Sequence, residues 1–216
     1  MDGLEQADGF WYRPWTRDLR NINETRQLFN RPVAPVAGDV LLDIGAHIGT
    51  VTRYALDAGA AKVKAVEPAP DNVHLFRMNV DDPRCELVEA AACGSVIGEE
   101  TFYLNPGKGS DSHTLVAVRR YTPIQVKTLS LADLCEGFDP TYVKVDIEGG
   151  EYQLDLIESF PDSADRLFIE FHFRRKGDRE KGLEIKRKLL GELGFELVRG
   201  FNWTAGAWGV DEVYRR

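Results

Sequence analysis

Residues 41–50 read LLDIGAHIGT, an apolar run that ends in an acid and continues into two glycines four positions apart. The apolar run predicts a buried strand over residues 39–44, and the residues after Gly49 predict a helix over 50–58. The glycines then form the turn between the two elements. In α/β proteins such a turn commonly holds a nucleotide-like cofactor, so this one is expected to bind NAD, a phosphate donor or S-adenosylmethionine.

The spacing of the glycines separates these three cofactors. A dinucleotide loop needs G-x-G-x-x-G and a phosphate-binding P-loop needs Gly-Lys-Ser/Thr, whereas Gly45 and Gly49 give G-x-x-x-G with His47 between them. An acid before a tight turn, here Asp43, suits a cationic ligand better than a phosphate. S-adenosylmethionine carries a positive amino group and a positive sulfonium, and it is therefore the predicted cofactor.

Short apolar runs alternate with helical patterns along the rest of the chain. Predicted strands occupy 39–44, 62–67, 86–92, 141–147, 166–172, 195–201 and 208–214, and predicted helices include 50–58, 152–160 and 178–193. This alternation predicts an open, doubly wound α/β sheet in a single domain spanning 1–216. Residues 99–127 break the pattern and predict an antiparallel β insertion. Residues 1–38 precede the sheet and are expected to cap it.

The composition limits the partners. The chain has 216 residues and a net charge of −8, which opposes broad binding to nucleic acid or to an anionic membrane. No apolar run approaches the roughly 20 residues that cross a bilayer, and the N-terminus lacks a signal-peptide pattern. We therefore expect a cytoplasmic protein that acts on a small molecule, with nucleic acid an unlikely partner.

Conspicuous polar residues follow the strands that would line the ligand site. In an open α/β sheet, ligands bind beyond the carboxyl ends of the strands. Glu67 ends the second predicted strand, where a carboxylate can accept hydrogen bonds from ribose hydroxyls. Lys144, Asp146 and Glu148 share one face of the fourth strand, and Gly149 and Gly150 permit a turn into the next helix. The fifth strand likewise presents Glu170 and His172.

These acids and the imidazole predict a catalytic group beside the cofactor's methyl. His172 is a possible base for a hydroxyl nucleophile, or a residue that only orients a neighbour. Asp146, Glu170 and His172 have the composition of a metal site, but no compact ligand motif supports one, and no metal is predicted. The predicted catalytic residues are Asp146, Glu148, Glu170 and His172.

Several motifs together resemble the FkbM family of S-adenosylmethionine-dependent methyltransferases. They are LLDIGAHIGT, VEP at 66–68, AAACG at 90–94, VKVDIEGGE at 143–151 and LFIEFH at 167–172. The DIEGGE segment is the most specific, and YRPWTRDLR at 12–20 loosely resembles a segment that precedes the family's cofactor loop. The resemblance implies a seven-stranded, Rossmann-like sheet whose last strand is antiparallel. It also implies cofactor contacts from Asp43, Gly45, Ala46, His47, Gly49, Glu67, Pro68, Ala92 and Asp146.

The resemblance also implies a reaction class, commonly O-methylation of sugars, polyketides or other natural products. N-methylation of an amine or of an amino-acid-derived group remains an alternative, because acids attract a cation. DNA base methylation is disfavoured, because the fourth strand lacks an NPPY-like tetrapeptide. A module that binds S-adenosylmethionine without catalysis stays open. Neither the methyl acceptor nor the oligomeric state follows from the sequence.

Overall fold

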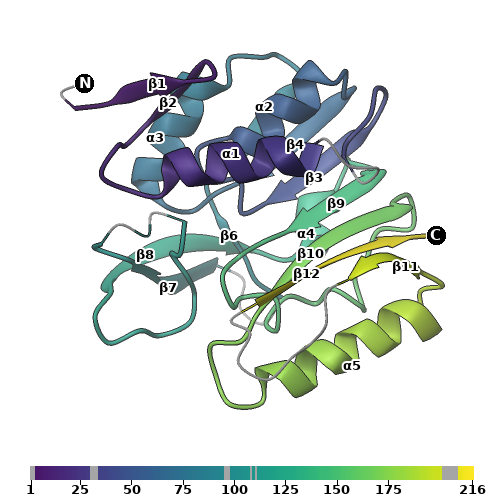
Figure 1. Ribbon diagram of the computed structural model, residues 1–216. Helices are drawn as coiled ribbons and strands as arrows, with labels where there is room; N and C mark the ends of the chain where they lie inside the picture. The colour runs from purple at the N-terminus through teal and green to yellow at the C-terminus, as the bar shows by residue number, and fades with distance from the viewer. Residues whose placement is uncertain (1–2, 30–33, 95–97, 108, 110, 201–208) are drawn as a thin grey trace.

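A seven-stranded sheet forms the centre of the molecule in the computed structural model, which describes residues 3–29, 34–94, 98–107, 109, 111–200 and 209–216 (Figure 1). Its strand order is β11-β12-β10-β9-β3-β4-β5. The strands are β3 (Val40–Ile44), β4 (Lys62–Val66), β5 (Cys85–Val88), β9 (Tyr142–Val145), β10 (Arg166–His172), β11 (Glu196–Gly200) and β12 (Gly209–Arg215). The predicted doubly wound α/β fold is confirmed.

The sheet is parallel except at β12. Strands β3, β4, β5, β9 and β10 pair in parallel, while β12 lies antiparallel between β10 and β11. The chain order runs outward from β3 through β4 to β5, then returns to β9 on the other side of β3. This reversal lies at the carboxyl ends of β3 and β9, where an open sheet binds its ligand.

Helices cover both faces of the sheet, as continuous apolar strands require. On one face, Leu42, Val143 and Ile169 pack with Leu134 of α4 (Leu131–Cys135) and Leu189 of α5 (Asp178–Gly191). On the other face, Leu41 and its neighbours pack with Ala55 and Leu56 of α2 (Thr50–Asp57). A further helix, α3 (Pro70–Asn79), follows β4. These two cores hold the strand ends in place where the strand order reverses.

The predicted insertion is an antiparallel pair, β7 (Gly98–Leu104) with β8 (Thr122–Leu129). The predicted strand 86–92 is divided in two, because only Cys85–Val88 joins the main sheet. The two residues of β6 (Ala91–Ala92) pair in parallel with β8 instead. The insertion is thereby attached through β6 just after the carboxyl end of β5, and β6, β7 and β8 lie together beside the main sheet (Figure 1).

The N-terminal segment packs beside the turn after β3. It forms a small hairpin, β1 (Glu5–Ala7) and β2 (Phe10–Tyr12), and the helix α1 (Asp18–Phe29). Phe10, Tyr12 and Ile22 form an apolar cluster with Ile48 and Leu75. The segment thus attaches to the turn after β3 through Ile48 and to α3 through Leu75.

The predicted helix over 152–160 is wrong. The segment is a series of turns, and Leu154, Leu156 and Phe160 enter the core below the sheet. The regularly spaced apolar residues of this segment are indeed buried, but the backbone that carries them is irregular. Gly149 and Gly150 therefore lead into turns and not into a helix. Among the described residues, no helix combines the length and the apolar character that crossing a bilayer requires.

Candidate active site

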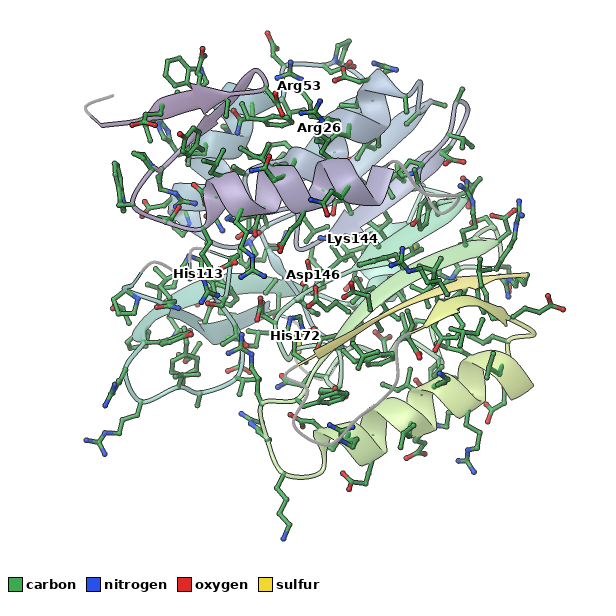
Figure 2. All side chains as sticks on the ribbon, in the orientation of Figure 1. Arg26, Arg53, His113, Lys144, Asp146 and His172 are labelled. Carbon is green, nitrogen blue, oxygen red and sulfur yellow. The ribbon has the colours of Figure 1, made fainter. Side chains whose placement is uncertain are left out.

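A cleft of about 1060 Å³ opens at the carboxyl ends of the parallel strands, between α1 and the insertion (Figure 2). Ten of the predicted site residues line it: Gly45, Ala46, His47, Glu67, Pro68, Ala92, Asp146, Glu148, Glu170 and His172. Asp43 and Gly49 do not. The cleft brings together strand ends that are about a hundred residues apart in the sequence.

Gly45 allows the turn after β3 to lie against the end of β9. Its φ is +85°, and a Cβ built on it would be 1.9 Å from the carbonyl oxygen of Asp146. The backbone N–H groups of Gly45 and Ala46 both donate to the carbonyl of Val66 at 3.0 Å. A side chain at position 45 would therefore separate strand ends that now touch.

Glu67 lies at the base of the cleft and organises the turn. One carboxylate oxygen accepts from the backbone N–H of His47 at 2.9 Å. The other accepts from the backbone N–H of Ala69 at 2.9 Å and from the Asn72 side chain at 3.2 Å. A carboxylate has about four acceptor sites, so Glu67 keeps capacity for a ligand hydroxyl.

A closed ring of hydrogen bonds and one carboxylate–imidazole contact ties the N-terminal segment to Glu67. Arg13 donates to Asp18 at 2.8 Å and to Asn72 at 2.7 Å. Asp18 lies 3.2 Å from the His47 ring nitrogen Nε2. Asn72 and the His47 backbone then meet at Glu67, which completes the ring.

Burial opposes the charge on Asp18, yet its contacts with His47 and Arg13 lower its pKa far below the ordinary value. Arg13, Asp18 and Asn72 were not among the predicted site residues. The loose YRPWTRDLR resemblance was the one signal in the sequence that pointed to this segment.

Asp43 has a different position from the predicted one. It is fully buried behind the turn, where it accepts from Thr52 at 2.7 Å and lies 3.3 Å from the Lys144 ammonium. Lys144 also donates to the carbonyl of Gly45 at 2.7 Å. Burial opposes the lysine charge, but Asp43 and Asp146 raise its pKa overall. Asp43 therefore shapes the turn through Lys144 and does not line the cleft.

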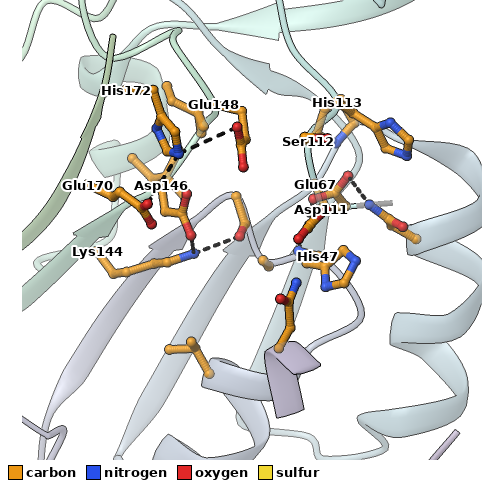
Figure 3. A pocket seen from close by; sticks show the side chains of 18 of the residues that line it. His47, Glu67, Asp111, Ser112, His113, Lys144, Asp146, Glu148, Glu170 and His172 are labelled. Carbon is orange, nitrogen blue, oxygen red and sulfur yellow. Dashed lines mark hydrogen bonds and ion pairs between the residues drawn. The ribbon is translucent and has the colours of Figure 1, made fainter. Parts of the chain in front are cut away.

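The opposite side of the cleft holds a group of acids around His172. Figure 3 shows Lys144, Asp146, Glu148, Glu170 and His172 gathered together, with His47, Glu67 and Asp111 across the pocket. The His172 nitrogen Nε2 lies 3.3 Å from Glu170 and 3.4 Å from Glu148. Arg174 also contacts Glu148. The structure thus brings together all four predicted catalytic residues.

Glu151, the last acid of DIEGGE, organises this group from behind. It is fully buried, and one of its oxygens accepts from the backbone N–H groups of Ile147 and Gly149 at 3.3 and 3.1 Å. The same oxygen lies 3.0 Å from Nδ1 of His172. Glu148 adopts a left-handed φ of 56° within the turn that Glu151 holds. Backbone strain of this kind persists only where surrounding contacts fix it.

The protonation of the group follows from its surroundings. Burial opposes charge on His172, but hydrogen bonds with Glu151 and Glu170 raise its pKa well above the ordinary value. Burial also raises the pKa of Glu148 and of Glu170. Burial and Glu170 raise the pKa of Asp211 on β12 to about 7. A raised pKa favours the protonated imidazole, the form that cannot act as the predicted base.

Two more residues of this group were missed by sequence reasoning. Asp211 is the direct cross-strand partner of Glu170, a like-charge pair that costs stability. Its position depends on the antiparallel β12, which no local pattern specifies. Glu151 belongs to the DIEGGE segment, so its motif could have identified it.

The insertion contributes His113 to the cleft. Nδ1 of this ring accepts from the backbone N–H of Asn105 at 2.9 Å. Burial, with smaller contributions from His47 and Arg13, lowers the pKa of His113 to about 4. Asp111 of the same loop lies 3.9 Å from Arg17 of the N-terminal segment. The insertion and the N-terminal segment therefore both border the cleft.

The sequence matches the family model described as "Methyltransferase FkbM domain" over residues 43–197. None of the curated protein sequences matches the chain.

Solved structures share its fold at low sequence identity. M. jannaschii TYW2 in complex with AdoMet has a TM-score of 0.54 and 16% identity, covering 99% of this chain and 85% of that one. A precorrin-8w decarboxylase from Methanobacterium thermoautotrophicum has a TM-score of 0.51 and 16% identity, covering 90% and 89%. Methyltransferase FkbM from Methylobacillus flagellatus has a TM-score of 0.50 and 18% identity, covering 83% and 44%.

Proposed function

The chain belongs to the FkbM family of methyltransferases, whose methyl donor is S-adenosylmethionine, and from this premise we propose that it O-methylates a small natural product. The acceptor is a hydroxyl group of a sugar, a polyketide or a related molecule. We further propose that residues 1–216 form one methyltransferase domain, because the N-terminal segment and the insertion both border the same cleft.

The shape of the turn after β3 supports its role in holding the cofactor. Gly45, Ala46 and His47 line the cleft, and Glu67 faces it from the end of β4 with acceptor capacity left for ribose hydroxyls. Pro68 and Ala92 add apolar walls on the same side. Asp146 is suited to the methionine end, since its carboxylate favours the cofactor's ammonium.

The observation that carries the proposal is the position of the acid group across the cleft. Asp146, Glu148 and Glu170 line the same cavity as Glu67 and the turn, so a donor on one side would face an acceptor held on the other. Carboxylates accept hydrogen bonds from a hydroxyl, orient it and receive its proton. A binding module without catalysis would need no such group.

In the methyl transfer, the main contribution of the protein is to position the donor and the acceptor. S-adenosylmethionine supplies an electrophilic methyl group when bound. With the cofactor bound, Asp146, Glu148 and Glu170 would orient an acceptor hydroxyl toward the methyl group and take up the proton that the hydroxyl loses on transfer. The chain's residues hold the two reactants in register and exclude water, which is the main source of rate in such a step.

N-methylation is the second candidate, favoured by one specific observation. The acids near His172 outnumber the cations Lys144 and Arg174 that contact them, so the acceptor side of the cleft favours a positive group. A protonated amine would bind there. It would then have to lose a proton before it could attack.

Transfer from methyl-labelled S-adenosylmethionine to a panel of acceptors tests the proposal. The panel contains hydroxyl compounds, matched amines and an unmodified RNA, and mass spectrometry locates the methyl group. A methyl ether in the product supports O-methylation, and a methylamine supports the second candidate. Methylated RNA as the best product, or tight cofactor binding with no transfer to any acceptor, contradicts the proposed function.

A further inference from the structure

Three side chains of the group around His172 lie close enough together to hold one metal ion. Asp146, Glu148 and His172 each offer one ligand atom, and the three atoms lie within 4.8 Å of one another. Two of these residues follow β9 and the third ends β10, so the set arises from adjacent parallel strands. All three line the cleft, which leaves room for further ligands.

The back of His172 supplies a second and independent observation. Histidines that bind metals almost always donate their other ring N–H to a carboxylate, a carbonyl or water, which fixes the tautomer and the ring orientation. Nδ1 of His172 lies 3.0 Å from the fully buried Glu151, so Nε2 is directed toward Glu148 and Glu170. Glu151 does not line the cleft. Glu151 therefore contacts His172 at the ring nitrogen that faces away from the cleft.

Around Asp146, Glu148 and His172 the carboxylates outnumber the positively charged side chains. Arg174 contacts Glu148 through Oε2, and no described residue donates a hydrogen bond to Oε1. Asp146 lies 3.7 Å from Lys144, and its side chain is partly exposed to the cleft. Glu170 and its cross-strand partner Asp211 add two more carboxylates at the same place. A small cation would relieve this repulsion.

We propose that Asp146, Glu148 and His172 bind a divalent first-row transition metal ion, with Glu170 as a neighbour able to join the ligands. One imidazole nitrogen with carboxylate oxygens suits Mn²⁺, Fe²⁺ or Zn²⁺ better than Ca²⁺. The metal binds an unprotonated Nε2, so a proton on this nitrogen leaves to solvent when the metal binds. No redox change is involved.

The metal would act on the acceptor of the reaction proposed above, and in that respect the inference rests on that function. A hydroxyl oxygen bound to a divalent cation holds its proton less tightly and is fixed in place beside the donor. The chain's own role is to present three ligands and leave the remaining positions of the metal open toward the cleft.

Binding of Mn²⁺ alone to the full chain tests the site without reference to catalysis. The protein is treated with a chelator and dialysed, and then titrated with Mn²⁺ while electron paramagnetic resonance measures the free ion. We expect one site per chain. His172→Gln and Glu148→Gln should each weaken binding at least about tenfold, and Glu151→Gln should weaken it about tenfold by releasing the His172 ring.

Asp81→Asn is the matched control, because Asp81 is exposed and lies outside the cleft. This variant should bind Mn²⁺ with the affinity of the wild type. Circular dichroism confirms that each variant is folded. Absence of a stoichiometric site overturns the proposal, as does equal binding by folded His172→Gln. A protein that binds a protonated amine but no metal at this place also overturns it.

Calorimetry with S-adenosylhomocysteine separates this inference from the proposed function. The cofactor product should bind to the metal-free protein, because the turn and Glu67 lie across the cleft from His172 and because Asp146, without a metal, stays open to the cofactor's ammonium. Cofactor binding without Mn²⁺ binding overturns the metal site alone. Mn²⁺ binding without cofactor binding counts against the proposed function alone.

Discussion

The Nε2 atom of His47 lies 3.2 Å from Oδ1 of Asp18, which joins the start of α1 to the turn after β3. Asp18 is fully buried and also holds Arg13, so this contact belongs to the ring that ends on Glu67. His47 adopts a left-handed φ of 53°, a conformation uncommon for a residue other than glycine. The N-terminal segment is therefore part of the wall that a cofactor would meet.

Asp18→Asn should weaken both the fold and cofactor binding. The substitution leaves Arg13 buried without its carboxylate partner, and losing one member of a buried pair costs about 3 kcal/mol. We expect S-adenosylmethionine affinity to fall about tenfold, because His47 and Asn72 no longer fix Glu67. Calorimetry and urea unfolding measure the two effects. Unchanged affinity, equal to that of the surface control Asp81→Asn, would show that the ring has no role in binding.

Glu67→Gln should reduce cofactor affinity with little change in shape. A glutamine places an NH₂ group where the carboxylate now accepts from N–H donors, so at least one of these contacts becomes unfavourable. Hydrogen bonds to a charged group contribute about 1.5–3 kcal/mol, which predicts a dissociation constant roughly ten- to a hundredfold higher. Glu89→Gln, on the surface, is the control. A dissociation constant within twofold of wild type would remove Glu67 from the cofactor site.

Gly45→Ala compared with Gly38→Ala separates backbone strain from close approach. Both glycines have a φ near +85°, but nothing lies within 4 Å of a Cβ at position 38. Gly38→Ala should therefore cost about 1 kcal/mol from strain alone. At position 45 the Cβ meets the Asp146 carbonyl, so the free energy of unfolding should fall by at least about 2 kcal/mol more. Equal losses in urea unfolding would mean that the strand ends are not in contact.

His113 should make stability depend on pH below 6.5. Its pKa falls from 6.5 when unfolded to about 4 in the folded protein, mainly through burial. Between these values the unfolded chain binds more protons, so stability is full above pH 6.5 and decreases as the pH falls toward 4. His113→Gln should remove a decrease on the order of 2 kcal/mol from unfolding curves at these pH values. If the variant shows the same pH dependence as the wild type, the His113 ring is exposed to solvent and not buried in the folded protein.

The sequence predicted the sheet well because its strands carry their own signal. Strands buried on both faces are apolar throughout, and the G-x-x-x-G turn fixes where the first of them ends. The helix predicted over 152–160 was wrong, because the same apolar spacing suits an irregular segment whose side chains fill the core. Periodicity reports which side chains are buried, and burial alone does not fix backbone conformation.

Local sequence patterns were enough to predict the fold class, the family and ten of the residues that line the cleft, because each strand carries its functional group at its own end. The contacts that these groups make depend on packing between distant segments. The tertiary structure placed Asp43 behind the turn, joined Asp18 to His47, and set Glu151 and Asp211 against β10. Residues from distant segments meet through packing and strand order, and no local pattern in the chain encodes such distances.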